Sequence, residues 1–422
     1  MPDTDAPQAL NTIPEWPTLA PYTIPEWPPP PRDCRSPNGR IWSDAPTAAR
    51  KKCIVYDRET IDTLDPEAIG NLTPPQLAYV SAMIKDGVHH YISNVPDDVE
   101  YALICYKGCA LPFTVSRKQE TVFPVSPKTC WIDYARLLYR KSDGRAPAPF
   151  SNFLLGAIGK VARFERLITL NNWWLTNNPT PRFSREHIRV FVDYFTSAYP
   201  DYMIVVKSLP ETDPTKVLPI LRDEGFDFVK FRFMHFRVPE AKRTKNFRAD
   251  QNLLKKMPLQ TYYASRITAS QAAECERLYQ SLYIGKHTEM NTQLNRNWME
   301  LCCNTGFLDF FMIENGGSTK GLVVSYGDPI GINVGTCGYD LGEPKKTGLY
   351  RILVASTLLK GEAEGKTVNL STSVPRFKEL RGTHRVIEYE AVYTKHLSPL
   401  TCGLMKAFAW GYNNCLDKMR CA

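Results

Sequence analysis

From about residue 70 onward, the apolar positions follow either helical or strand spacing. In 184–199 they recur every three or four residues, which indicates a helix, and Ser184 is suited to its N-cap. Runs of β-branched and aromatic residues at 202–207 and 227–236 indicate strands on either side of a helix over 214–223. This order of elements is typical of α/β proteins.

The last 160 residues contain a longer succession of elements. Their pattern predicts the order β-α-α-β-β-β-α-β-α-β, followed by a final helix. The predicted ranges are 260–267, 270–283, 291–303, 308–313, 321–326, 332–340, 349–364, 367–370, 374–380, 386–393 and 399–416. The pair Gly316-Gly317 marks one hairpin turn between the central strands, and Gly327-Asp-Pro-Ile-Gly331 marks a second.

The region before residue 240 is less regular. The pattern predicts helices over 74–86 and 150–166 and strands over 101–106 and 121–125. Residues 240–256 are rich in Lys and Arg and read as a polar connector with a helix. We therefore divide the chain into an N-terminal segment (1–60), a first domain (61–257) and a second domain (258–422).

The first 50 residues hold 12 of the 33 prolines and an exact duplication of Thr-Ile-Pro-Glu-Trp-Pro, at 12–17 and 23–28. Proline at this density blocks helices and sheet ladders, which predicts an extended, polyproline-like chain. Because Trp16 and Trp27 are large apolar groups to leave in water, we expect the segment to lie as a strap across the folded body.

Length and composition narrow the class of protein. At 422 residues, with 43% apolar and 23% charged residues, the chain fits a soluble globular protein of more than one domain. No stretch is long and apolar enough to span a membrane, and the N-terminus lacks the features of a secretory signal, so we expect a cytoplasmic protein. The net charge of +8 suits an anionic partner, although many proteins without one are equally basic.

The 12 cysteines contain no Cys-x-x-Cys pair, and the histidines form no compact cluster with carboxylates. We therefore expect reduced thiols and no metal site.

A basic, glycine-containing turn precedes the predicted helix 349–364. It is formed by Lys345, Lys346, Thr347 and Gly348 and continues into Leu349, Tyr350 and Arg351 at the start of the helix. Unpaired N–H groups and the helix dipole make such a helix start a phosphate-binding site, and the cationic side chains add to it.

Together with the element order, Gly338-Tyr-Asp340 and Asn369-Leu-Ser371, this turn resembles the GNAT acyltransferase fold. The resemblance implies a mixed sheet that splays open, with acyl-CoA bound at residues 345–351 as a co-substrate. Tyr350 departs from the family pattern, because it replaces a small residue where the CoA pyrophosphate would approach.

A second resemblance covers Gly348 to Gly365 and Phe377-Lys-Glu-Leu-Arg-Gly382, which are similar to the Fem-type aminoacyl-tRNA-dependent transferases. That family contains two GNAT-like halves, and its motif lysine lies at the reaction centre. The resemblance therefore implies a reaction-centre role for Lys378, whose ammonium can stabilise an oxyanion; an exposed lysine on a short helix is the alternative. Arg381 stands where the family has an aromatic residue.

The two resemblances lead to one fold prediction. Residues 184–236 repeat the α-β-α-β order of 349–393 without the basic turn. We predict an α/β fold with a mixed sheet, built from two tandem GNAT-like domains of which the N-terminal one is degenerate.

Five residues are candidates for the chemistry. Asp340 ends the strand before the basic turn and is the first candidate for a base, although a strand-end aspartate often accepts only backbone N–H bonds. Glu388 shares a strand face with Glu390 by alternation and suits an acceptor ammonium, but a solvated sheet face is the simpler expectation. Tyr393 is a candidate acid, although a strand tyrosine is more often a core residue. His384 follows the Phe377–Gly382 motif, which includes Lys378, closely enough to reach the same site, although a lone loop histidine is usually just exposed.

These observations lead to three hypotheses of function. The first is an N-acyltransferase that transfers an acyl group directly from acyl-CoA or an acyl carrier protein to a small amine acceptor. The second is a Fem-like transferase that uses aminoacyl-tRNA. The third is a non-catalytic scaffold. Because a tandem fold supplies its own pseudo-dimer, we expect a monomer.

Overall fold

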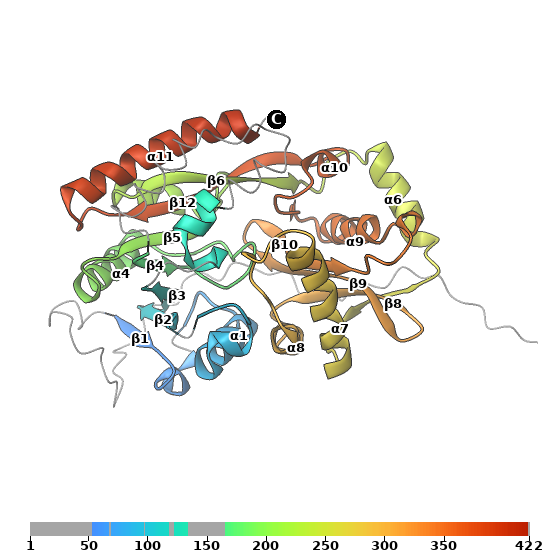
Figure 1. Cartoon of the computed structure of the whole chain (residues 1–422), viewed down its shortest axis with the longest axis horizontal. Helices are drawn as coiled ribbons and strands as arrows, with labels where there is room; N and C mark the ends of the chain where they lie inside the picture. Colours follow the sequence, from blue (N-terminus) through green and yellow to red (C-terminus); the bar gives the residue numbers. More distant parts are fainter. Residues whose placement is uncertain (1–52, 67–68, 97, 118–121, 134–164, 421–422) are drawn as a thin grey trace, which may run out of the picture.

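The computed structural model describes residues 53–66, 69–96, 98–117, 122–133 and 165–420 (Figure 1). The Pro- and Trp-rich segment and the greater part of the predicted helix 150–166 lie outside the described residues. The predictions for these segments are therefore not compared with the structure.

The described elements form two halves with the same order. The first half consists of β1 (Ile54–Tyr56), α1 (Pro74–Asp86), β2 (Glu100–Tyr106), β3 (Cys109–Ser116), β4 (Leu167–Leu170), α4 (Arg185–Ala198), β5 (Met203–Pro210), α5 (Val217–Asp223) and β6 (Asp227–Arg237). The second half consists of β7 (Gln260–Ala264), α7 (Ala269–Gln280), the π-turn η6 (Ser281–Gly285), α8 (Arg296–Asn304), β8 (Asp309–Asn315), β9 (Ser318–Asp328), β10 (Gly331–Tyr339), η7 (Lys345–Thr347), α9 (Leu349–Glu364), β11 (Val368–Asn369), α10 (Pro375–Glu379) and β12 (His384–Tyr393). Helix α6 (Lys245–Lys255) links the halves, and α11 (Pro399–Arg420) ends the chain. The predicted mixed α/β fold with tandem halves is confirmed.

All twelve described strands belong to one sheet, in the order β1-β2-β3-β4-β5-β12-β6-β11-β10-β9-β8-β7. The order is symmetric, because each strand of one half has its counterpart at the same distance from the centre. Each half contains one parallel pair, β4 with β5 and β10 with β11, and the central strands β5, β12, β6 and β11 are antiparallel. The final strand of each half therefore pairs with strands of the other half.

Local sequence explains where the helices begin. Thr73, Ser184 and Thr268 form capping boxes with the residue three positions later, and Thr244 caps the linker helix α6. Gly316 and Gly317 have positive φ values of 56° and 81°, as the two-residue turn between β8 and β9 requires. Both hairpin turns predicted for the second half are present.

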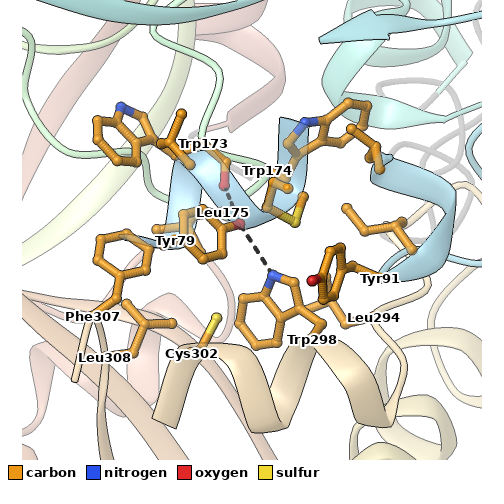
Figure 2. Close-up of a cluster of buried hydrophobic side chains, with 14 of the residues drawn as sticks. Tyr79, Tyr91, Trp173, Trp174, Leu175, Leu294, Trp298, Cys302, Phe307 and Leu308 are labelled. Carbon is orange, nitrogen blue, oxygen red and sulfur yellow. Dashed lines mark hydrogen bonds between the residues drawn. The ribbon is translucent and has the colours of Figure 1, made fainter. Parts of the chain in front are cut away.

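Aromatic side chains from both halves share one core (Figure 2). The Tyr79 hydroxyl on α1 donates to the carbonyl of Trp173 at 2.8 Å and accepts from Nε1 of Trp298 on α8 at 3.2 Å. Phe307 stacks on Trp173 and packs against Tyr79. Because these buried rings satisfy their polar atoms across the boundary, the halves are held together by packing as well as by the sheet.

Helices cover both faces of the sheet. Apolar side chains of α4 and α5 pack on β2 to β5, and those of α9 pack on β8 to β10. Helix α11 covers the opposite side of β5, β6 and β12 (Figure 1). The side chain of Trp131 packs with it there. This arrangement leaves the centre of the sheet enclosed.

One predicted element is wrong. The sequence predicts a strand at 121–125, but Phe123–Val125 forms a 3₁₀ turn. Pro124 explains the difference, because its nitrogen cannot donate to a sheet ladder. Strands β1, β3 and β4 are additional to the predicted elements, and β1 begins before residue 61, the predicted start of the first domain.

Candidate active site

The sheet opens between β10 and β11. These strands pair only through Ile332–Val368 and Asn333–Asn369, whereas β10 continues beside β9 as far as Tyr339. Beyond Asn333, the edge of β10 that faces β11 lacks a strand partner among the described residues. Since buried backbone groups require hydrogen-bond partners, other parts of the chain must supply them or leave them to a ligand.

Asn177 enters this opening from the first half. Its Nδ2 donates to the carbonyl of Val334 on β10 at 2.7 Å, and its Oδ1 accepts from Arg232 at 2.9 Å and from Ser371 Oγ at 3.3 Å. Its own carbonyl accepts from the Tyr326 hydroxyl at 2.8 Å. No local pattern in the sequence marks Asn177, because its partners are distant in the chain.

Lys378 lies on the other side of the opening, on α10. Its side chain is only 2% exposed, and Nζ donates to the carbonyl of Leu370 at 2.5 Å. Among the described residues, no carboxylate lies within ion-pair distance of Nζ. Burial, with a smaller contribution from the nearby Arg232 charge, lowers the pKa of Lys378 to about 7. The alternative of an exposed lysine does not hold.

The backbone that carries Lys378 is irregular. Ser371 and Val374 have positive φ values of 61° and 51°, which non-glycine residues seldom adopt. Pro375 then begins α10, as expected for proline in the first helical turn. Such strain persists only where the surroundings enforce it, and it is common at functional sites.

Tyr283 reaches the same opening from the π-turn η6. Its hydroxyl lies 3.9 Å from Sγ of Cys337 on β10, and its ring stacks on Tyr279 at 4.8 Å. Burial raises the pKa of Tyr283 well above its ordinary value, so the hydroxyl stays protonated. The charge of Lys378 also acts on Cys337, which places the three groups in one neighbourhood. Tyr283 is not among the catalytic residues that the sequence predicts.

The predicted phosphate turn directly precedes α9. Gly348 adopts φ 72° before α9 and provides no side-chain cap, so the first N–H groups of the helix are left for a ligand. A Cβ at this glycine would come within 2.6 Å of Leu253 Cδ2. Lys345 and Lys346 are exposed beside it. The turn therefore retains the features of an anion site.

Tyr350 fills the space beside this turn. Its ring lies 5.8 Å from that of Tyr339 and 5.0 Å from that of Phe377, and burial raises its pKa. Tyr350 therefore contacts the residue that directly precedes Lys378.

Asp340 lies at the outer end of β10. Its Oδ1 accepts from the Gly342 N–H at 2.9 Å, and Oδ2 lies 3.1 Å from Nζ of Lys320. This hydrogen bond and the Lys320 ammonium hold the pKa of Asp340 below its ordinary value. Asp340 is therefore a weak base, and its contacts are those of a strand-end aspartate.

Glu388 and Glu390 share one face of β12, as alternation predicts, but this face is buried rather than solvated. Glu388 forms a buried ion pair with Arg232, and Glu390 accepts from Nε1 of Trp131 at 2.6 Å. Nζ of Lys207 lies 3.9 Å from Glu390. The expectation of a solvated face is wrong because β12 occupies the centre of the sheet, where α11 and Trp131 cover it.

Two register shifts lie beside these glutamates. Between Tyr389 and Ala391 the extra residue is in β5, and between Glu388 and Tyr389 it is in β6. A bulge adds one residue to a strand and re-aims its side chains, and the one in β6 places Arg232 opposite Glu388. Lys207 lies on the glutamate face by alternation along β5. Both cations line a cavity of about 20 Å³ that has room for about one water molecule.

Tyr393 lies far from the region of Lys378, whereas His384 stands at the other end of the same strand. Tyr393 stacks on His396 at 5.7 Å, five residues and roughly 17 Å along β12 from Glu388. His384 begins β12 and borders a cavity of about 280 Å³ lined by Phe236, Ile330 and other residues. The structure thus brings Lys378, Tyr283 and the phosphate turn into one region, with Tyr393 outside it, and both His384 and Lys378 act on His235.

Two other kinds of feature are absent from the part of the chain that the structure describes. There, no three His, Cys, Asp or Glu side chains gather to hold a metal ion. No described helix combines the length and apolar character needed to cross a bilayer.

Comparison with known proteins gives matches to solved structures alone. Neither a family model nor a curated protein matches the chain. L-PGS from Bacillus licheniformis is 14% identical, with 57% of this chain and 82% of that chain covered and a TM-score of 0.42. FemX is 10% identical, with 71% of this chain and 88% of that chain covered and a TM-score of 0.38. A tandem GNAT protein from the clavulanic acid biosynthesis pathway is also 10% identical, with 81% of this chain and 98% of that chain covered and a TM-score of 0.34. These matches include both kinds of protein that the sequence resembles. Since the TM-scores lie below 0.5, the description of the fold rests on the topology above.

Replacement of Lys378 tests its burial. We expect the Lys378→Met variant to gain stability over the wild type as the pH falls from about 10 to about 7. The unfolded lysine binds its proton at higher pH than the folded one, so the wild type loses unfolding free energy across this window. A tenfold difference in proton affinity corresponds to roughly 1.4 kcal/mol. Urea unfolding at both pH values measures the effect, and a stability difference independent of pH would show that Lys378 is hydrated.

Proposed function

We propose that this protein transfers an acyl group from a phosphopantetheine thioester to an amine, at the opening between β10 and β11. The observation that carries the proposal is Lys378, a buried cationic group without a carboxylate partner in the described residues. The phosphate turn before α9 supplies a seat for the donor's phosphate groups.

The missing counter-ion explains how Lys378 would act. Attack of the amine on the thioester carbonyl places negative charge on the carbonyl oxygen. A Lys378 ammonium beside this oxygen gains its counter-ion only when that charge develops. Because the interaction is stronger in the transition state than in the ground state, it accelerates the reaction rather than only tightening binding.

Tyr283 supplies the proton that the leaving sulfur needs. As the tetrahedral intermediate collapses, the carbon–sulfur bond breaks and the Tyr283 hydroxyl protonates the thiolate. The ammonium nitrogen of the intermediate returns a proton to the tyrosinate, and the amide remains. In this scheme the acceptor enters as the neutral amine, and no covalent enzyme intermediate forms.

The thioester proposal predicts a large effect of Lys378. We expect Lys378→Met to lower kcat/KM for acyl-CoA with a primary amine by about 10² to 10³, as removal of one oxyanion donor does. Expressed per neutral amine, the wild-type rate constant should fall as the pH rises through about 7, where Lys378 loses its proton. Lys378→Arg, which stays charged, should lack this fall. Release of free thiol over a panel of acyl-CoA donors is the measurement.

The outcomes of this assay separate the hypotheses. Turnover that is equal in the wild type and Lys378→Met would rule out the proposed role of Lys378. Absence of turnover in folded wild-type protein, with every thioester, would direct the search to the aminoacyl-tRNA donor or leave the scaffold hypothesis.

The role of Tyr283 is tested through the leaving group. We expect Tyr283→Phe to lower the rate by about 10² with alkyl thioesters, a typical contribution of acid catalysis. With aryl thioesters, whose thiolates leave without a proton, the decrease should be only a few-fold. Tyr279→Phe, in the neighbouring ring of the same stack, is the matched control. An equal decrease with both donor types would contradict acid catalysis by Tyr283.

A second candidate function has its own observation. The outer face of α6 carries a run of exposed cations that continues to the phosphate turn: Lys242, Lys245, Arg248, Lys255, Lys256, Lys345 and Lys346. Leu253 of α6 lies against Gly348, so the helix and the turn are adjacent. A row of this kind suits a phosphate backbone. It favours aminoacyl-tRNA as an alternative donor to the same opening.

If the basic row binds tRNA, the KM for the aminoacyl-tRNA donor should depend on the salt concentration. With aminoacyl-tRNA, we expect Lys245→Glu/Arg248→Glu/Lys255→Glu to raise KM. The slope of log KM against log salt should fall by about one for each phosphate that the variant no longer binds. Lys406→Glu on α11 controls for a charge change elsewhere. An unchanged slope in the triple variant would remove the support that α6 gives to a tRNA donor.

A further inference from the structure

The linker helix α6 has a buried acidic residue on its inner side. Asp250 is 1% exposed, and its two carboxylate oxygens accept from two different arginines. Arg351 Nε lies 2.6 Å from Oδ1, and Arg381 Nε lies 2.6 Å from Oδ2. A buried carboxylate held by two guanidinium groups is a strong, directional contact.

The two arginines belong to the two elements that form the site. Arg351 lies in the first turn of α9, directly after the phosphate turn. Arg381 follows α10: its guanidinium lies 3.3 Å from the centroid of the Phe377 ring, and NH1 donates to the Phe377 carbonyl at 2.7 Å. Asp250 therefore connects the phosphate turn, through Arg381, to Phe377, which directly precedes Lys378.

Helix α10 depends on such contacts for its position. It has only five residues and begins after Val374, which has a positive φ value. A helix of this length has little stability of its own. Val374 and Leu380 at its two ends are 48% and 38% exposed, so apolar packing there is limited. The Arg381 contact replaces the missing packing with a buried ion pair.

We propose that Asp250 is a positioning residue, which holds α10 against the opening through Arg381 and so keeps Lys378 out of water. The catalytic meaning of this role rests on the proposed function, whereas the protection of Lys378 does not. We call the contacts of Asp250 with Arg351 and Arg381 the clamp. Helix α6 then has two roles: its outer face carries exposed cations, and its inner face carries the clamp that holds α9 and α10.

The surroundings of Lys378 explain the expected consequence. The groups that interact electrostatically with it are Cys337 on β10 and Arg232 and His235 on β6. None of these is a carboxylate, and the neighbouring Glu379 of α10 pairs with Arg385. Loosening of α10 would admit water to Nζ, because none of these groups replaces the cover that α10 provides.

The test is chemical labelling of Lys378, which needs no enzyme activity. Full-length wild type and Asp250→Asn are treated briefly with acetic anhydride at about pH 10, where a hydrated lysine is also partly neutral, and acetylation of the Lys378 peptide is followed by mass spectrometry. We expect labelling to rise at least tenfold in Asp250→Asn. Lys360, which is 4% exposed and pairs with Asp309 and Glu364, is the internal control and should not change.

Glu362→Gln is the matched control variant. Glu362 on α9 also holds two arginines, Arg237 and Arg243, but it makes no ion pair with α10 among the described residues. We expect this variant to leave Lys378 protected. Equal labelling of Lys378 in the wild type and Asp250→Asn would overturn the proposal, and so would an equal increase in Glu362→Gln, because general loosening would then suffice.

Two further measurements complete the test. Arg381→Met removes the second arm of the clamp, and it should expose Lys378 as Asp250→Asn does if the latter fails to fold. Where thioester turnover is present, Asp250→Asn should move the fall in kcat/KM per neutral amine from about pH 7 to higher pH, since a hydrated lysine regains its ordinary pKa. Asp250→Glu should partly restore the wild-type profile. Increased labelling without any turnover in the wild type would support the clamp and contradict only the proposed function.

Discussion

The pairing of β12 with β5 and β6 is the constraint on which the rest of the structure depends. Each half contributes its last strand to the centre of a common sheet, where that strand pairs with strands of the other half. Neither half alone would therefore have all its central strands paired. The buried rings of Tyr79, Trp173 and Trp298 then close the same boundary from one face (Figure 2). The two repeats are consequently one body, and groups from both of them meet at the opening between β10 and β11.

The opening shows how this body satisfies buried polar groups. Asn177 of the first half takes the free carbonyl of β10 and joins Arg232 to Ser371. Arg232 and Lys207 lie near Glu388 and Glu390, so those charges are largely compensated. Lys378 has only a carbonyl partner among the groups described. A buried ammonium of that kind is costly in the resting protein, and an anionic transition state would supply the charge it lacks.

Residues that depart from the family pattern have structural reasons. Arg381 takes the place of an aromatic residue, and its guanidinium covers Phe377 while it binds Asp250. Tyr350 takes the place of a small residue, and its ring packs against those of Tyr339 and Phe377. Both side chains thus make contacts among α6, α9, β10 and α10.

The sequence by itself determined the elements whose signals are local. Helix α9 at 349–364, the capping residue Ser184, the Gly316-Gly317 turn and the repeated order of the halves follow from propensity, caps and periodicity over a few residues. Only the tertiary structure decided which strand lies at the centre, and hence that Glu388 and Glu390 are buried. It also decided the partners of Lys378, Tyr283 and Asn177. These depend on contacts between residues far apart in the chain, and the spacing of residues within one strand or helix carries no information about them.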